Sequence, residues 1–324
     1  MDLPRPVGHD LPRAWLRAAL GSGRVAGSYL FVGPEGIGKA GVALEFAASL
    51  RCEAATGWAC GQCNECVRVA KGVHPSVRRF VRPPDKSDFP VELVRDIVDQ
   101  ASLKQLEPGR RVFIIEDADR FNESSANAFL KTLEEPPPGL HFVLVAGNLA
   151  QVLPTIISRC QAVRFSALDA EAVLHIARDW EGMPVSPDSR QLLARVSQGS
   201  PGRLRAMLDA GVLETAREFW KAVSADPFKA SEILAATLQE AEEGEAKRER
   251  LREVLALLSA ALRDRMLGAL GCADLPALTR EAPNEARTPD ALVRALQRID
   301  DLRARVDGNA NLKLVCDAIA IAWP

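Results

Sequence analysis

Short apolar runs alternate with helical patterns in the first half of the chain. Strands that are buried on both faces of a parallel sheet appear as continuous apolar runs rather than as alternating ones. Runs of this kind predict five strands, the last of them weaker than the others: Ser28–Val32, Ser76–Val81, Arg111–Ile115, His141–Ala146 and Ala162–Phe165.

Two segments between these runs repeat apolar residues at helical spacing. Pro90–Ala101 and Glu123–Glu135 each place their apolar side chains on one face, and Asn122 is a suitable N-cap for the second helix. The prolines that begin at Pro136 end that helix, because proline lacks the backbone donor. Strands separated by helices imply crossover connections and a mainly parallel α/β sheet.

The strand signal disappears after about Phe165. Short helices are expected over Asp169–Trp180 and Ser189–Ser197, and helical patterns continue from Val212 onward. The Glu- and Arg-rich positions between Ala236 and Arg252 are typical of a solvated helix face. We therefore predict three domains: an α/β nucleotide-binding-fold domain at 1–166, a small helical domain at 167–208 and a larger helical domain at 209–324.

Composition narrows the class of protein. The 324 residues are 47% hydrophobic and 26% charged, as expected for a globular chain of two or three domains. A net charge of -2 argues against a protein that coats nucleic acid along its whole surface. No apolar run approaches the roughly 20 residues that span a bilayer. Residues 1–10 lack a signal core, so a cytoplasmic location is expected.

A glycine-rich segment between the first strand and the next helix predicts a phosphate-binding loop. Gly33, Gly36 and Gly38 precede Lys39, which is the spacing at which backbone N–H groups and a lysine surround nucleotide phosphates. An ordinary glycine-rich turn is the alternative. Ala40 stands where a Ser or Thr hydroxyl would bind Mg²⁺. Restoring Thr at this position is expected to improve Mg²⁺-dependent nucleotide affinity.

Two acids at the end of the third strand predict the metal side of the same site. Glu116 and Asp117 follow an apolar strand, as in a Walker B element, but in the reverse of the usual order of Asp then Glu. The alternative is that both acids cap the next loop. Together with Ala40, this order predicts weak or absent hydrolysis, while some ATP or ADP binding through the backbone and Lys39 can persist.

Four of the seven cysteines form a cluster with the spacing C-x7-C-x2-C-x2-C. Overlapping C-x2-C turns point backbone N–H groups at thiolates, and four thiolates complete a closed tetrahedral zinc site. The predicted ligands are Cys52, Cys60, Cys63 and Cys66. Unligated thiols, an iron–sulfur cluster and a redox dithiol are the alternatives. His74 is expected in a turn rather than in the site, and the remaining cysteines, Cys160, Cys272 and Cys316, are scattered.

Two motifs resemble the clamp-loader AAA+ subunits of bacterial DNA polymerase III. They are Asn127–Pro137 (NAFLKTLEEPP) and Ile157–Cys160 (ISRC), and the cysteine cluster also has its family position after the phosphate-loop helix. The resemblance covers about Leu16–Gly202 well, and the tail, with Asn309–Leu312, more weakly. It implies a RecA-like parallel sheet with a zinc insertion, a helical lid domain and a helical collar domain.

Within this family, gamma/tau motors keep intact nucleotide sites, whereas the delta-prime kind does not. Ala40 and the reversed acids depart from the motor pattern. Gly202 stands where a motor carries its sensor-2 arginine, with Arg203 one position away, and Gly147 stands at the sensor-1 position beside Asn148. These departures favour the delta-prime kind, which is part of a heteropentameric ring with gamma/tau and delta subunits and loads the sliding clamp on primed DNA.

The resemblance also assigns a function to Arg159. In the family, the arginine of the Ser-Arg-Cys motif reaches across a subunit boundary to the γ-phosphate held by the neighbour. A guanidinium suits this because it stays charged and presents a planar fork to phosphate oxygens. An internally salt-bridged arginine is the alternative.

Two other functions are alternatives to the delta-prime hypothesis. The first is an active gamma/tau-type ATPase, against which stand Ala40 and a chain that ends at Pro324 without an extension. The second is a zinc-containing nucleic-acid-binding module with a vestigial phosphate loop. Its basic face would comprise Lys71, Arg78, Arg79 and Arg82, which are more simply scattered solvent contacts.

Overall fold

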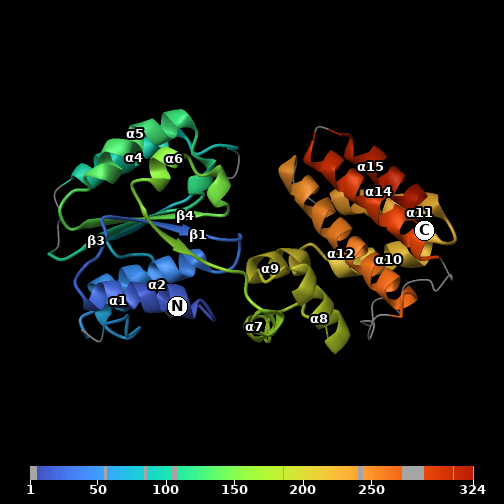
Figure 1. Cartoon of the computed structure of the whole chain (residues 1–324), viewed down its shortest axis with the longest axis horizontal. Coiled ribbons are helices and arrows are strands. Elements are labelled where there is room, and N and C mark those ends of the chain that lie inside the picture. Colours follow the sequence, from blue (N-terminus) through green and yellow to red (C-terminus); the bar gives the residue numbers. More distant parts are fainter. Residues whose placement is uncertain are drawn as a thin grey trace. The chain divides into compact units, whose positions relative to one another are not determined.

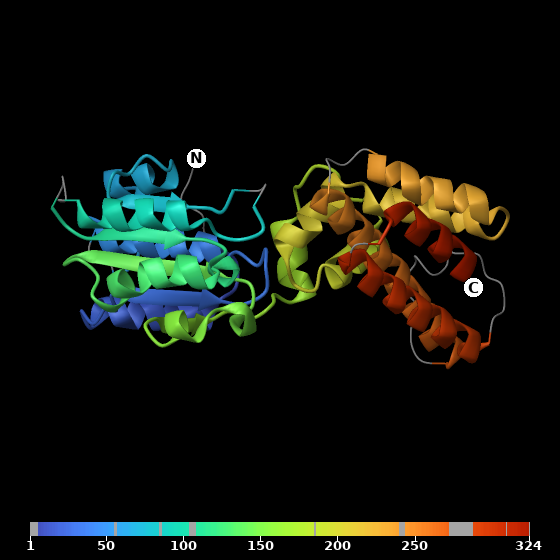
Figure 2. The same cartoon turned by 90° about the horizontal axis from the view of Figure 1, so that it is seen from above.

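The computed structural model describes residues 6–54, 57–83, 86–103, 108–184, 186–239, 244–271, 288–308 and 310–323. The chain forms two compact units, Met1–Leu168 and Asp169–Pro324 (Figures 1 and 2). The boundary at 168 lies close to the predicted domain boundary at 166. The finer predicted division at 208 falls inside the second unit and stays a prediction.

The first unit is built around a parallel sheet of five strands in the order β2-β3-β4-β1-β5 (Figure 1). All four neighbouring pairs are parallel, so the predicted crossover topology is confirmed. The strands lie within one or two residues of the predicted runs: β1 (Ser28–Val32), β2 (Val77–Phe80), β3 (Arg111–Ile115), β4 (Leu140–Ala146) and β5 (Gln161–Arg164).

Alternate residues of the strands supply two separate cores, one on each face of the sheet. Tyr29 and Phe31 of β1 pack with Val42 and Phe46 in one core. The intervening Leu30 packs in the other. The first face is covered by α1 (Asp10–Gly21), α2 (Lys39–Arg51) and α3 (Asn64–Ala70), and the second by α4 (Val91–Ser102), α5 (Glu123–Glu134) and α6 (Pro154–Ile157), as Figure 1 shows.

Helices α4 and α5 match the two predicted amphipathic segments. The Asn122 side chain accepts a hydrogen bond of 2.9 Å from the backbone N–H of Ser125, which confirms the predicted N-cap. Helix α5 ends at Glu134, two residues before Pro136. Helices α1 and α3 were not predicted. Two short 3-10 helices, η1 (Ala118–Arg120) and η2 (Leu149–Gln151), follow β3 and β4.

The second unit contains helices and no strand in the residues that the structure describes. Arg203 pairs with the buried Glu253 at 2.7 Å, which joins two of these helices within the unit. Cys272, one of the scattered cysteines, and Asn309, in the weaker C-terminal part of the family resemblance, lie outside the described residues. The helices are α7 (Ala170–Ile176), α8 (Pro187–Val196), α9 (Pro201–Asp209), α10 (Val212–Val223), α11 (Pro227–Gln239), α12 (Glu245–Ala269), α14 (Pro289–Asp307) and α15 (Leu312–Ala322).

The α/β parallel sheet followed by a helical region confirms the predicted fold class. No helix in the described part of the chain is long and apolar enough to cross a bilayer.

Candidate functional site

The predicted phosphate loop connects β1 to the first turn of α2. Gly36 and Gly38 have φ angles of 69° and 100°, which favour glycine because a Cβ disfavours this left-handed region. Gly33 is required for a different reason, since a Cβ there would lie 2.2 Å from the carbonyl oxygen of Phe165. The loop therefore has the backbone that a phosphate-binding loop requires.

Lys39 is almost fully buried at the start of α2. Its Nζ donates hydrogen bonds to the carbonyl oxygens of Gly33 at 2.6 Å and Pro34 at 2.5 Å. Burial lowers the pKa of Lys39, and the nearby acids, Glu35 first, oppose that shift. The lysine is thus held by the loop itself, and a phosphate would have to compete with these two carbonyl groups.

A cavity of about 350 Å³ brings the predicted nucleotide-site residues together. Ala40 presents only a methyl group to this space, so the side chain that follows Lys39 offers no oxygen to a metal. Gly33 is not among the lining residues. The lining comprises Glu35, Gly36, Gly38, Lys39, Ala40, Glu116, Asp117, Val145, Ala146 and Gly147.

Both acids of the predicted metal side form ion pairs with arginines. Glu116 pairs with Arg79 of β2, and Arg82 Nε lies 3.3 Å from Asp117 Oδ2. Asp117 also adopts a left-handed backbone with a φ of 56°, which is uncommon for a residue other than glycine. Residues that would bind Mg²⁺ in an intact site therefore bind guanidinium groups, and the site does not fit a Mg²⁺–nucleotide complex.

Two further acids belong to this site and were not predicted. Asp119 Oδ2 accepts hydrogen bonds from the backbone N–H groups of Gly147 at 2.9 Å and Asn148 at 3.1 Å. A Cβ at Gly147 would lie 2.9 Å from Glu35 Cγ, so glycine at this position makes room for Glu35. The available sequence signal was the position of Asp119 two residues beyond Asp117, at the sheet edge where the carboxyl ends of parallel strands meet.

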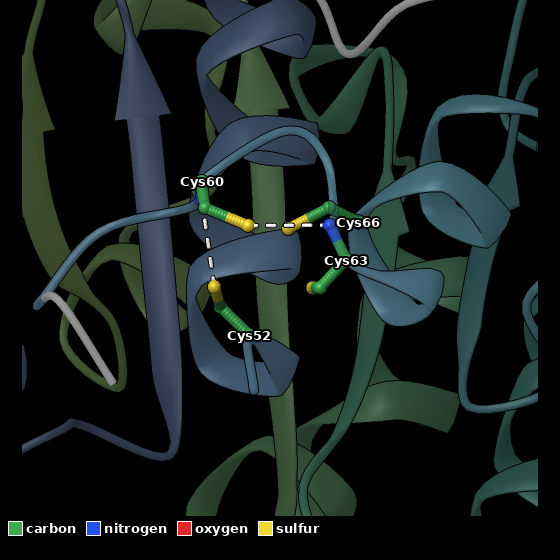
Figure 3. A group of neighbouring side chains, drawn as sticks. All are labelled: Cys52, Cys60, Cys63 and Cys66. Atoms are coloured by element: carbon green, nitrogen blue, oxygen red, sulfur yellow. Dashed lines mark hydrogen bonds between the residues drawn. The ribbon is translucent and has the colours of Figure 1, made fainter. Parts of the chain in front are cut away.

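The four predicted cysteine ligands converge at the end of α2 and the start of α3 (Figure 3). Their sulfur atoms all lie within 4.8 Å of one another. A tetrahedral zinc ion with bonds of about 2.3 Å separates its sulfurs by about 3.8 Å, so only small shifts of the side chains are needed. Cys60 and Cys63 donate backbone N–H bonds to Cys52 Sγ and Cys60 Sγ at 3.4 and 3.3 Å.

The chemistry of the cluster also fits a metal. Backbone N–H groups of Gln62 and Cys63 lower the pKa of Cys60 to about 6, whereas burial raises the pKa of Cys66. Bound metal stabilises thiolates, which favours ionisation of all four ligands. The cluster can therefore hold one ion in an all-sulfur site with no position left for a substrate.

A buried ion-pair network supports the helix that carries Cys66. Glu65 accepts hydrogen bonds from Arg51 Nε at 2.7 Å and from His74 Nε2 at 3.0 Å. His74 Nδ1 accepts from the backbone N–H of Ser76, so Nε2 carries the proton of a neutral ring. His74 therefore orients Glu65 at the turn before β2, as its predicted place in a turn suggested, and does not join the cysteine cluster.

Arg159 lies just beyond α6 and is 29% exposed. Its Nε and Nη2 each lie 3.3 Å from Glu134 Oε2, and its Nη1 donates to the carbonyl oxygen of Thr155 at 3.1 Å. The internal salt bridge that was the alternative for Arg159 is thus present in this chain. Its contact with a neighbouring subunit stays a prediction.

The arginines proposed for a basic face have specific partners. Arg79 and Arg82 pair with the site acids, and Arg78 donates to Gln100. Each of these three side chains therefore has a partner within the first unit, and the basic face stays a prediction.

Comparison with known proteins shows what the N-terminal unit is similar to. Residues 11–169 match the family model described as DNA polymerase III, delta subunit. The delta-prime subunit of DNA polymerase III from Pseudomonas aeruginosa is 36% identical over 200 residues, which are 60% of this chain and 59% of that protein. The tau subunit from Escherichia coli is 33% identical over 201 residues, which are 60% of this chain and 30% of that protein.

The chain therefore spans about three fifths of the delta-prime relative and less of the tau relative. Among solved structures, a gamma-subunit-related protein of DNA polymerase III from Thermotoga maritima matches at 20% identity with a TM-score of 0.44, covering 96% of this chain and 98% of that chain. The family and sequence matches confirm the resemblance to a delta-prime-like clamp-loader subunit of bacterial DNA polymerase III.

Proposed function

We propose that this delta-prime-like clamp-loader chain is a subunit with weak or absent ATP hydrolysis of its own. It acts as a scaffold in a heteropentameric ring and supplies Arg159 to the nucleotide site of a neighbouring motor subunit. The ring as a whole opens the sliding clamp and loads it on primed DNA. The proposed partners are the gamma/tau and delta subunits, with the clamp and DNA reached through the complex, in the cytoplasm.

The observation that carries this proposal is the state of the nucleotide cavity. Ala40 offers no hydroxyl beside Lys39, and Glu116 and Asp117 are both engaged by arginines. Phosphoryl transfer depends on a metal ion that neutralises developing charge, and the two acids expected to bind it are each paired with an arginine here. Nucleotide can still contact the backbone of Gly36 and Gly38, so weak binding is compatible with this cavity.

Arg159 is the residue proposed to act on a neighbour. Its side chain is partly exposed, and Glu134, its partner, is 61% exposed, so the pair lies where another subunit can reach it. An exposed ion pair of this kind contributes about 0–1 kcal/mol, which is little compared with the interaction of a guanidinium with a phosphate in a dry interface. Exchanging Glu134 for a phosphate is therefore energetically accessible.

The cysteine cluster is proposed to hold a structural zinc ion. All-thiolate ligation and the absence of an open position suit zinc in a closed site. The ion would join the C-terminal end of α2 to α3, next to the network of Arg51, Glu65 and His74. The ion would stabilise the fold and take no part in catalysis.

An active gamma/tau-type ATPase is the second candidate, because the tau subunit of Escherichia coli is nearly as similar as the delta-prime relative. Steady-state ATP turnover of the purified chain, measured with Mg²⁺, separates the two. Under the delta-prime hypothesis, the ATP turnover of the unchanged chain should be no higher than the background of a Lys39→Ala variant. The chain should also co-purify with the gamma/tau and delta subunits. If the purified chain turns over ATP steadily and Lys39→Ala abolishes that turnover, the motor hypothesis is established instead.

A further inference from the structure

Strand β2 places a cation against Glu116, one of the acids that line the nucleotide cavity. Neighbouring residues of a strand point to opposite faces. Arg79 of β2 accordingly reaches Glu116, whereas Arg78, one residue earlier, reaches Gln100. Arg82 follows the strand and lies 3.3 Å from Asp117. Two consecutive acids just beyond β3 thus meet one arginine of the adjacent edge strand and one that follows it.

These contacts engage one oxygen of each carboxylate, Glu116 Oε1 and Asp117 Oδ2, with a positive charge. Mg²⁺ requires near-octahedral oxygen ligands, often from one or two carboxylates of the protein. A guanidinium bound to the same carboxylate engages its lone pairs and places a positive charge next to the position of the ion. The hydrogen bond to Glu116 raises the pKa of Arg79, so this charge is stabilised where it lies.

We infer that Arg79 and Arg82 take the electrostatic place of Mg²⁺ in this cavity and exclude the ion independently of Ala40. The cavity then has two separate barriers to a Mg²⁺–nucleotide complex, a missing hydroxyl and a pair of resident cations. The inference deepens the proposed function and rests on its claim that this chain does not hydrolyse ATP. It also changes the expectation that Thr at position 40 improves Mg²⁺-dependent nucleotide affinity. Restoring the hydroxyl leaves both arginines in place, so the improvement should require their removal as well.

The charges around the cavity are consistent with cations built into the protein. Lys39, Arg79 and Arg82 face Glu35, Glu116, Asp117 and Asp119, which is three positive groups against four negative ones and a balance of -1. Asp119 is already engaged by the N–H groups of Gly147 and Asn148. The site is therefore nearly neutral without a bound ion, and any nucleotide affinity of the unchanged chain should be the same with Mg²⁺ and with EDTA.

The test compares four forms of the full chain: unchanged, Ala40→Thr, Arg79→Gln with Arg82→Gln, and the triple variant. The affinity of each for a fluorescent ADP analogue is measured with Mg²⁺ and with EDTA, after a thermal melt confirms folding. Ala40→Thr alone and the arginine double variant are each expected to change the ratio of the two affinities by less than about twofold. The triple variant should bind about tenfold or more tightly with Mg²⁺ than with EDTA.

Arg78→Gln is the matched control, because Arg78 lies on the same strand and contacts Gln100 instead of the acids. Combined with Ala40→Thr, it should give no Mg²⁺ dependence. Full Mg²⁺ dependence in Ala40→Thr alone, or none in a folded triple variant, overturns the inference. Either result leaves the proposed function standing as long as the unchanged chain does not turn over ATP. ATP turnover by the unchanged chain overturns the proposed function itself.

Discussion

Arg159 and Glu134 face each other at the surface of the first unit, with two guanidinium nitrogens each 3.3 Å from the same carboxylate oxygen. Glu134 is the last residue of α5, and Arg159 follows the short helix α6. The two motifs that carry the family resemblance therefore meet through this ion pair. If Arg159 acts on a neighbouring subunit, it must exchange Glu134 for a phosphate group when the ring assembles.

Removing the charge of Glu134 tests this exchange. Glu134→Gln should change the free energy of unfolding by less than about 1 kcal/mol, because exposed ion pairs contribute little. ATP turnover of the assembled ring should stay within about fivefold of the unchanged ring, since the arginine loses only a weak competitor. Urea unfolding and ring ATPase assays check both values. A loss as large as that of Arg159→Ala would mean that Glu134 positions the arginine during catalysis.

Removing Arg159 should leave this chain folded and impair its neighbour. Arginine fingers contribute roughly 10³ to 10⁵ in rate, so turnover of the one motor site that Arg159 contacts should fall by about 10³ or more in Arg159→Ala. The total ATP turnover of the ring should then fall by the fraction that this one site contributes. Arg164→Ala, at the exposed end of β5, is the control and should have no effect. Unchanged ring activity in Arg159→Ala would remove the proposed function of this residue.

Metal analysis tests the cysteine cluster. The purified chain should contain about one zinc ion, and Cys63→Ser should lose it and lower the thermal unfolding temperature, because metal binding is coupled to folding. Cys316→Ala, in α15, should keep the full metal content, since burial raises the pKa of Cys316 to about 12 and it lies outside the cluster. Iron in place of zinc would indicate a cluster of another kind, and a metal-free, fully stable chain would refute the site.

Glu253 gives a prediction about pH. Burial raises its pKa above 4.5, although the ion pair with Arg203 opposes this shift. A carboxyl with a raised pKa holds its proton more tightly in the folded state, so stability falls as pH rises from about 4.5 through the folded-state pKa. Glu253→Gln keeps an oxygen acceptor for Arg203 and should remove this slope, which is at most about 1.4 kcal/mol per pH unit for one proton.

The measurement for Glu253 is urea unfolding at several pH values. Glu214→Gln is the control, because Glu214 is an exposed residue of α10 and its removal should leave the pH dependence unchanged. Among the described residues, no hydrogen-bond partner reaches Glu253 Oε2, so its burial is only partly compensated. The same slope in Glu253→Gln and in the unchanged chain would contradict the prediction.

Much of the first unit could be predicted from the sequence because its signals are local. Parallel strands are buried on both faces, so Ser28–Val32 and Arg111–Ile115 appear as apolar runs whose bounds the structure reproduces. The cysteine cluster was predictable because two C-x2-C turns impose their own geometry within a few residues. Helices α1 and α3 were missed because α1 precedes the first strand and α3 follows α2 with no strand between them.

The sequence by itself determined the phosphate loop, the missing hydroxyl at Ala40, the reversed acids and the order of elements. Only the tertiary structure decided the partners of the charged side chains. Arg79 meets Glu116, and Arg159 meets Glu134, across elements that are distant in the chain. Strand order and side-chain direction set such contacts, and neither is encoded in the local pattern of apolar and polar residues.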